Sequence, residues 1–199
     1  MTSQSTNSSG NKPSRDDLIL DAVREAVIRH GVRRTTANDI AEGAGISRMT
    51  FYRAMGSVDE AVLRTLTREF ALGTAQAKSD ATASTARERL VDFAVDSVRT
   101  FAMSPLIRSI GERDPELLVP YVTDRFGSSQ AIVLDAIGAF LTEGEADGTI
   151  QSRPALATAL LVTLQGFGLS SKILAARGEL ESSFAELRTL LNAYLAAEA

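Results

Sequence analysis

The chain has 199 residues, of which 44% are hydrophobic and 23% charged, as is typical of one or two globular domains with a buried core. It has no Cys and a single His, His30, which excludes disulfides, thiol nucleophiles, Cys-ligated metals and sites built from several histidines. The net charge of −4 argues against a nucleic-acid partner held by bulk charge, so the distribution of charge becomes important.

The first fourteen residues are rich in Ser, Thr, Asn and Gly, and they predict a disordered tail over residues 1–14. This segment lacks the apolar stretch of a secretory signal. The most apolar stretch, residues 155–171, is interrupted by Thr, Gln and Ser side chains, which favours a buried helix over a membrane span. We therefore expect a cytoplasmic protein with no membrane partner.

Apolar residues recur at three-and-four spacing along the rest of the chain, which predicts an all-α fold of about nine to ten helices. The first helix has Asp16 and Asp17 in its first turn and ends at Gly31, as the helix dipole favours. A short second helix is expected after Thr36, a third over 47–54 and a fourth over 57–77. After a linker at 78–84, further helices are expected at 85–102, 105–112, 115–126, 128–146, 154–176 and 182–197.

Proline and serine support several of these helix starts. Pro105, Pro115 and Pro154 each suit a first helical turn, and Ser182 suits an N-cap. A change in composition near residue 64 divides the chain into a small N-terminal domain over residues 15–63 and a larger helical domain over residues 64–199.

Residues 35–53 form the most informative segment, with the sequence TTANDIAEGAGISRMTFYR. A short helix, a turn at Gly45 and a helix capped by Ser47 make a helix-turn-helix. Packing of the apolar residues inward leaves a polar and basic face on the second helix, consisting of Arg48, Met49, Thr50, Tyr52 and Arg53. Such side chains bind base edges and phosphates in a DNA groove, and the first three lie where base contacts are expected. Thr36 caps the preceding helix, whose N-terminus would face a phosphate.

The helix-turn-helix region has a net positive charge, although the chain as a whole is acidic. Residues 29–53 contain five Arg against Asp39 and Glu42, whereas the excess of acidic residues lies after residue 63. Arg33 and Arg34 precede the second helix and are further candidates for phosphate contact. The segment therefore offers a basic face for DNA.

The N-terminal part resembles the TetR (TetR/AcrR) family of bacterial transcriptional regulators over roughly residues 16–63. The matching motifs are ILDAVREAVIRHG (19–31), TTANDIAEGAGIS (35–47), FYR (51–53) and SVDEAV (57–62). The resemblance implies a three-helix DNA-binding domain joined to a helical ligand-binding and dimerisation domain. It also implies DNA contacts from Thr36, Arg48, Met49, Thr50, Tyr52 and Arg53, with Tyr52 on a phosphate.

The chain departs from the family pattern just after this motif. Met55 stands where Phe is usual, and Gly56 and Val58 stand where Lys is frequent. These substitutions put a phosphate contact at the start of the fourth helix in doubt, and Arg33 and Arg34 are candidates to replace it.

The last two predicted helices carry more apolar residues than one buried face needs, which predicts a four-helix bundle between two copies of the chain. The alternative is that they belong to the chain's own core. The expected dimer interface consists of Leu160, Leu161, Leu164, Phe167, Gly168, Leu187, Leu190, Leu191 and Tyr194.

We also expect a cavity for a small apolar or amphipathic effector among the central helices, with no cofactor. The alternative for its aromatic residues is again a plain core. The candidate lining consists of Phe93, Phe101, Met103, Ile107, Arg108, Tyr121, Phe126, Phe140, Leu164 and Gln165.

These features together predict a ligand-responsive homodimeric repressor that binds a palindromic operator in double-stranded DNA through the helix at 47–54. An activator or a ligand-independent DNA-binding regulator is the alternative. A small-molecule-binding helical protein without a DNA function is less favoured. The sequence shows no nucleophile–base pair, metal cluster or phosphate loop, so we do not expect an enzyme.

Overall fold

The computed structural model describes residues 14–119, 126–151 and 153–196, and within these ranges the chain is helical, which confirms the all-α prediction. One isolated bridge pairs Ile150 with Ala196. The elements are α1 (Arg15–His30), α2 (Ala37–Gly43), α3 (Arg48–Met55), α4 (Val58–Asp80), α5 (Ala86–Met103), α6 (Pro105–Arg113), the short 3-10 helix η1 (Pro115–Leu117), α8 (Ser128–Ala146), α9 (Leu156–Ala176) and α10 (Leu180–Leu195).

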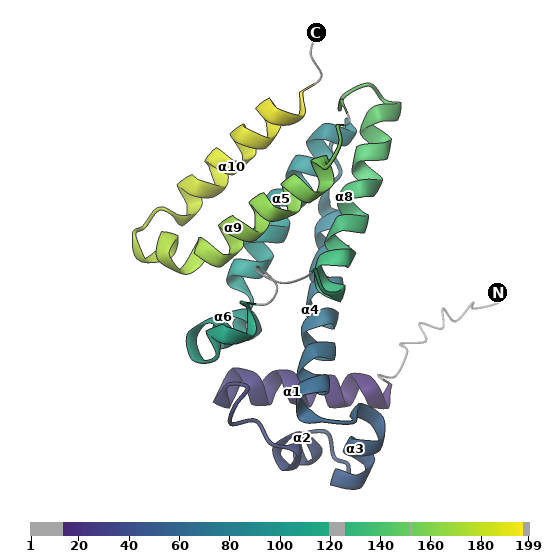
Figure 1. The fold of residues 1–199 in the computed structure, drawn as a ribbon, viewed down its shortest axis with the longest axis vertical. Coiled ribbons are helices and arrows are strands. Elements are labelled where there is room, and N and C mark those ends of the chain that lie inside the picture. Colours follow the sequence, from purple (N-terminus) through teal and green to yellow (C-terminus); the bar gives the residue numbers. More distant parts are fainter. Residues whose placement is uncertain (1–13, 120–125, 152, 197–199) are drawn as a thin grey trace, which may run out of the picture.

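The helices α1, α2 and α3 form a small unit at one end of the molecule (Figure 1). Each begins with a side-chain cap, because the hydroxyl of Ser14, Thr36 or Ser47 accepts a hydrogen bond from the backbone N–H three residues on. Their apolar faces meet in one buried cluster, which includes residues from α6 and the start of α4: Ile19, Val23, Val27, Ile40, Phe51, Ala61, Leu106 and Ile110. The N-terminal unit therefore shares its core with the rest of the chain.

Helix α4 runs without interruption from the N-terminal unit into the larger helical domain (Figure 1). The predicted domain boundary at residue 63 falls inside it. In the larger domain, α5 packs against α4, α8, α9 and α10, and the buried core includes Phe93, Ile137, Leu160 and Leu187. Figure 1 shows α4 extending upward from α1 into the larger domain, where α5 and α8 lie beside its upper part and α9 passes across α5.

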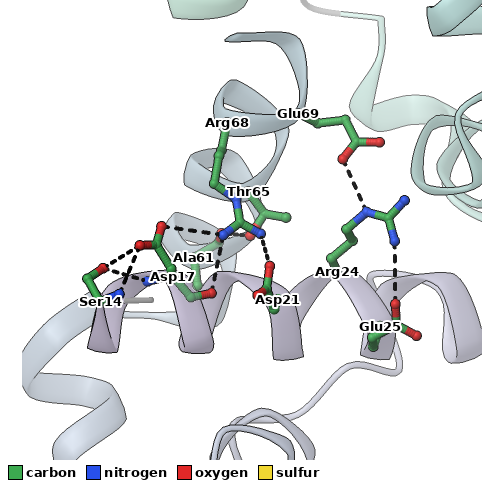
Figure 2. A network of polar contacts seen from close by, with 9 residues as sticks. All are labelled: Ser14, Asp17, Asp21, Arg24, Glu25, Ala61, Thr65, Arg68 and Glu69. Carbon is green, nitrogen blue, oxygen red and sulfur yellow. Dashed lines mark hydrogen bonds and ion pairs between the residues drawn. The ribbon is translucent and has the colours of Figure 1, made fainter. Parts of the chain in front are cut away.

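Ion pairs join α1 to α4 (Figure 2). The Arg68 guanidinium donates to a carboxylate oxygen of Asp21 at 2.5 Å and to the backbone carbonyl of Asp17 at 3.2 Å. One turn of α1 further along, Arg24 Nε donates to Glu69 Oε2 at 3.1 Å. These contacts fix α1 on the part of α4 that leads into the larger domain.

Three predicted helix boundaries were wrong. Of the helix predicted over 115–126, the structure shows only the short η1, and residues 120–125 lie outside the described ranges. Helix α9 begins at Leu156 because Ala155 has left-handed backbone dihedral angles, so Pro154 precedes the helix. Helix α10 begins at Leu180, and the Ser182 hydroxyl donates to the Glu179 carbonyl instead of capping the helix.

The two predicted irregular segments also need revision. Helix α4 extends to Asp80, so the linker predicted from residue 78 begins after that residue. Ser14 is the N-cap of α1 and hence part of the folded chain, whereas the remainder of the predicted tail, residues 1–13, lies outside the described ranges.

Helix α9 is less buried than predicted. By length and composition it is the one described helix that could cross a membrane, yet only 22% of its apolar window is buried within the chain. One side, which includes Leu160, Leu161 and Leu164, packs into the core, and the other exposes Val162, Leu169 and Ile173. The prediction of a buried helix therefore holds for one side only, and an apolar stripe of α9 faces outward.

Candidate nucleic-acid interface and effector cavity

The outer face of α3 presents the side chains predicted to read DNA. Arg48, Met49, Tyr52 and Arg53 are exposed, and Met49 is 77% exposed. Phe51 and Met55 point inward into the shared core. The Tyr52 ring packs edge-on against Phe51, with ring centroids 5.3 Å apart, which orients the exposed phenol. Two guanidiniums, a thioether and a phenol thus lie together on one short, well-anchored helix.

Thr50 differs from its neighbours because its hydroxyl already has a local partner. Thr50 Oγ1 lies 2.9 Å from Ser47 Oγ, and the Thr50 backbone N–H donates to the same Ser47 oxygen at 3.1 Å. The cap of α3 itself is the hydrogen bond from the Thr50 N–H to Ser47, and either hydroxyl can be the donor between the two side chains. Thr50 can therefore offer a base edge its methyl group, and also its hydroxyl proton where Ser47 donates to it.

Thr36 is exposed at the start of α2 and is held by a capping box. Its hydroxyl and its backbone N–H both donate to Asp39 Oδ2, at 2.7 and 3.0 Å. These hydrogen bonds, the one from the side chain first, lower the pKa of Asp39 below its ordinary value. The Thr36 N–H thus already donates to the Asp39 carboxylate. A phosphate at this helix end would have to bind the later N–H groups of the first turn.

Arg33 and Arg34 precede α2, and the structure gives them different roles. The Arg33 guanidinium pairs with Glu116 at 2.5 Å and lies 3.7 Å from Asp114, so a phosphate would have to displace carboxylates. Arg34 is exposed, and no hydrogen bond or ion pair links it to another described residue. Arg34 therefore remains the available cation of the two.

The start of α4 offers little to a phosphate beyond its own helix end. Ser57 caps the helix by accepting from the Glu60 N–H at 3.1 Å, and Asp59 and Glu60 are exposed in its first turn. Gly56 adopts a positive φ of 77°, which terminates α3. Where lysines are frequent in the family, this chain thus has a tight turn and two carboxylates.

A cavity of about 320 Å³ lies in the larger domain between α4, α5, α6, α8 and α9. Its wall is mostly apolar, with Leu66, Phe70, Val98, Phe101, Ile107 and Leu161 among the lining side chains. This volume is at the lower end of the range for sites that take drug-sized ligands. The cavity borders the core shared with the N-terminal unit, because Leu66 and Ile107 belong to both.

Of the ten side chains predicted to line an effector cavity, the structure places Phe101, Ile107, Leu164 and Gln165 on its wall. Phe93 and Phe140 do not reach it, because their rings pack against each other at 5.3 Å inside the core. Met103 and Arg108 are exposed, and Phe126 lines a separate surface hollow. Tyr121 lies outside the described residues.

Apart from Gln165, sequence reasoning missed the polar side chains of the cavity, among them Glu69, Ser97 and Ser104. For Glu69 a signal existed: it continues the three-and-four spacing of Val62, Leu66 and Gly73, so a charge interrupts an otherwise inward stripe. Polar residues at such positions are easily assigned to the surface when only the sequence is available.

The predicted dimer residues divide into two groups. Six of them are buried within the chain, as the alternative of an intrachain core predicts: Leu160, Leu161, Leu164, Gly168, Leu187 and Leu191. Leu190 and Tyr194 are exposed, and Phe167 is half-buried. The outward face also includes Leu169, and the prediction omitted two of its members, Val162 and Ile173.

The helix-turn-helix and the helical domain with its cavity define a class of DNA-binding regulators, and comparisons with known proteins agree. The model of the family described as "Bacterial regulatory proteins, tetR family" matches residues 19–59. An HTH-type transcriptional regulator of Mycobacterium bovis is 31% identical over 179 residues, which cover 89% of this chain and 92% of that protein.

Solved structures share the whole fold. One, from a study of the control of antibiotic production by bacterial hormones, has a TM-score of 0.70 at 19% identity, covering 92% of this chain and 97% of its own. FadR from Bacillus subtilis, in complex with stearoyl-CoA, has a TM-score of 0.61 at 15% identity, covering 87% and 96%. The chain belongs to the tetR family of bacterial regulatory proteins: it is a DNA-binding transcriptional regulator and not an enzyme.

Proposed function

We propose that this regulator is an effector-responsive homodimeric repressor that binds a palindromic operator through α3 and acts in the cytoplasm, at the nucleoid when bound to DNA. The observation that carries the proposal is the outer face of α3, where Arg48, Met49, Tyr52 and Arg53 are exposed above a buried anchor. Arginine binds guanine edges or phosphates, and tyrosine donates to phosphates. Arg34 supplements this face at the start of α2.

Dimerisation is supported by the outward faces of α9 and α10. Val162, Leu169 and Ile173 lie on one side of α9 at spacings of seven and four, and Leu190 and Tyr194 are exposed on α10. Exposed apolar stripes of this kind mark interaction surfaces. Two such helix pairs related by a two-fold axis form a four-helix bundle, in which each copy covers the stripe of the other.

A two-fold dimer also meets the requirement of DNA reading. One short recognition helix reads few base pairs, whereas two related copies read half-sites about 34–36 Å apart or at multiples of that spacing. The acidic character of the chain outside the N-terminal unit keeps non-specific attraction to DNA low. Specific binding then rests on paired α3 helices.

The cavity supports control by a small apolar or amphipathic effector. An effector lowers DNA affinity when it binds better to a conformation whose two α3 helices are misplaced for the operator. The cavity lies between the core of the larger domain and the core shared with α1, which is where such a conformational change would act.

The proposal is tested by fluorescence anisotropy with the full chain and the DNA that flanks its own gene, at physiological salt. We expect saturable binding that a shuffled sequence of equal length does not compete. Arg48→Ala should weaken this binding by about fivefold or more, because a good arginine–base contact contributes about 1–3 kcal/mol. Arg108→Ala is the matched control, since it removes an equal charge from an exposed position on α6.

Equal affinity for operator and shuffled DNA, or an unchanged affinity after Arg48→Ala, would contradict the proposed interface. The position of the bound site distinguishes a repressor from an activator: we expect it to overlap the promoter.

A further inference from the structure

Glu69 lies where the cavity, α1 and α6 meet. Its Oε2 atom accepts a hydrogen bond from Arg24 Nε of α1 at 3.1 Å, and its Oε1 atom accepts from Ser104 Oγ at 2.7 Å. Figure 2 shows the carboxylate of Glu69 above α1, facing Arg24. Ser104 is both the C-cap of α5 and the N-cap of α6. One carboxylate thus holds the DNA-binding unit and the start of α6 together.

The same carboxylate is exceptional within the cavity. Among the described residues that line it, Glu69 is the one with a charge, and the described wall offers no Lys, Arg or His. A bound anion would therefore find no cation in the described wall, and the charged group it would face is Glu69, which Arg24 pairs with from outside the wall. A cation with N–H donors would find a carboxylate in a largely apolar surrounding, where charge-assisted hydrogen bonds are strong.

Ser97 provides a second, independent observation. It lines the cavity, and its hydroxyl oxygen is buried with no hydrogen-bond partner in the described part of the chain. Buried polar groups of this kind are rare in folded proteins because an unmade hydrogen bond is costly. Ser97 precedes Ser104 by seven residues, which is about 10 Å along a helix at 1.5 Å per residue. A ligand group at Ser97 would satisfy this hydroxyl.

We propose that the effector is an elongated apolar monocation, with a primary or secondary ammonium that binds Glu69 and a second polar group that bonds to Ser97. This inference rests on the proposed effector-responsive function and names the ligand class of that cavity. The ammonium competes with Arg24 and Ser104 for the oxygens of Glu69. Binding therefore weakens the contact between α4 and α1 and alters the cap of α6.

The contacts of α6 carry this change to the DNA-binding unit. Ser109 Oγ donates to the Val27 carbonyl at 2.8 Å, and Arg113 donates to the Ile28 carbonyl at 2.8 Å. Both carbonyls belong to the last turns of α1. A shift of α6 and the release of Arg24 thus both act on the C-terminal half of α1, and by linkage operator DNA lowers the affinity for the cation by the same factor.

The test uses four eight-carbon probes with the full chain: octylamine, 8-aminooctan-1-ol, 1-octanol and octanoate, measured by isothermal titration calorimetry at neutral pH. All four probes have the same eight-carbon alkyl chain, so differences in their affinity report on their head groups. We expect octylamine to bind at least about tenfold more tightly than 1-octanol, with octanoate weakest. We expect 8-aminooctan-1-ol to bind more tightly than octylamine, and Ser97→Ala to remove that gain.

Two substitutions should act in opposite directions, which separates a binding role from a general loss of structure. Glu69→Gln keeps hydrogen-bonding capacity but removes the charge, and it should abolish the preference for octylamine over 1-octanol. Arg24→Gln removes the competitor and should raise the affinity for octylamine. Thermal unfolding of both variants establishes that they are folded. In the wild type, octylamine should raise the operator Kd, and in Glu69→Gln it should not.

The inference is overturned if none of the probes binds, if 1-octanol or octanoate binds as tightly as octylamine, or if Glu69→Gln retains the preference. Calorimetry needs no DNA, so its outcome is independent of operator binding. Specific operator binding without a preference for the cation would refute the inference and leave a DNA-binding repressor. Preference for the cation without specific operator binding would refute the proposed function.

Discussion

Replacing Asp114 with Ala removes the buried carboxylate that joins the end of α6 to the loop after α1. Asp114 retains only 2% of its surface, and its Oδ2 atom accepts a hydrogen bond from the Val32 backbone N–H at 2.7 Å. Its Oδ1 atom accepts a longer one from the Arg33 N–H at 3.4 Å. Val32 is itself buried, so the substitution leaves its N–H without a partner and without access to bulk water.

The cost follows from these contacts. A hydrogen bond to a charged group contributes about 1.5–3 kcal/mol, and a buried donor left unpaired costs about 1–3 kcal/mol. The lost hydrogen bond and the unpaired Val32 N–H are two accounts of the same contact, so their costs are not added. We therefore expect Asp114→Ala to lower the free energy of unfolding by about 3 kcal/mol. For a chain of this length each kcal/mol lowers the Tm by about 2–4 °C, so the Tm should fall by about 6–12 °C.

Differential scanning calorimetry at one fixed protein concentration measures this change, because dimerisation makes the Tm depend on concentration. Glu116→Ala is the matched control: it removes the exposed partner of Arg33 and should change the free energy of unfolding by less than about 1 kcal/mol. A loss below about 1 kcal/mol for Asp114→Ala, or equal losses for both variants, would refute the reasoning.

Three further predictions concern other parts of the molecule. The double variant Ile173→Asp, Leu190→Asp should be monomeric by light scattering while Leu63→Asp, on the exposed side of α4, stays dimeric; a dimeric double variant would contradict the proposed interface. Gly144→Ala should destabilise the fold by about 1–3 kcal/mol, because the added Cβ would clash with the Ile150 side chain. Gly138→Ala, where the added Cβ meets open space, should instead stabilise α8 by about 0.5–1 kcal/mol. Denaturant unfolding of the two variants compares these changes in the free energy of unfolding. The hydroxyls of Ser14, Thr36 and Thr85 lower the pKa values of Asp17, Asp39 and Glu88, so each carboxylate contributes stability above its unfolded pKa of about 4 and loses it as the pH falls through the lower folded value. The Tm should therefore fall below about pH 4, and less steeply in the Asp17→Asn, Asp39→Asn, Glu88→Gln variant; equal slopes would contradict this.

The N-terminal unit could be predicted closely because its signals are local. Caps at Thr36 and Ser47 and the glycine at position 45, which has a φ of 64°, each fix a helix end or a turn within a few residues. The positions of the exposed side chains on α3 then follow from helical periodicity. What remained hidden was the local pairing of Thr50 with Ser47 and of Arg33 with Glu116, because a hydroxyl or guanidinium chooses among partners that only the fold brings near.

The larger domain was harder to predict because its apolar residues serve several purposes. Phe93 and Phe101 have the same residue type and both lie on α5, yet Phe93 packs against Phe140 and Phe101 lines the cavity. Likewise Leu161 is buried in the core while Val162, its neighbour in sequence, faces outward. Periodicity shows that a helix has an apolar face, but the neighbouring helices decide whether that face meets a core, a cavity or another copy.

Because α4 is one continuous helix, a small rotation of α4 in the larger domain displaces α3 relative to the operator. At 1.5 Å per residue, its 23 residues form a rod of about 35 Å. By simple trigonometry, a tilt of about 5° at the upper end of a rod of that length displaces its lower end by about 3 Å, close to the 3.4 Å rise between successive bases on one strand. Glu69, on the cavity wall, lies about 17 Å from the start of α4, so a rotation of about 10° at that point moves α3 by about 3 Å, enough to put it out of register with its half-site.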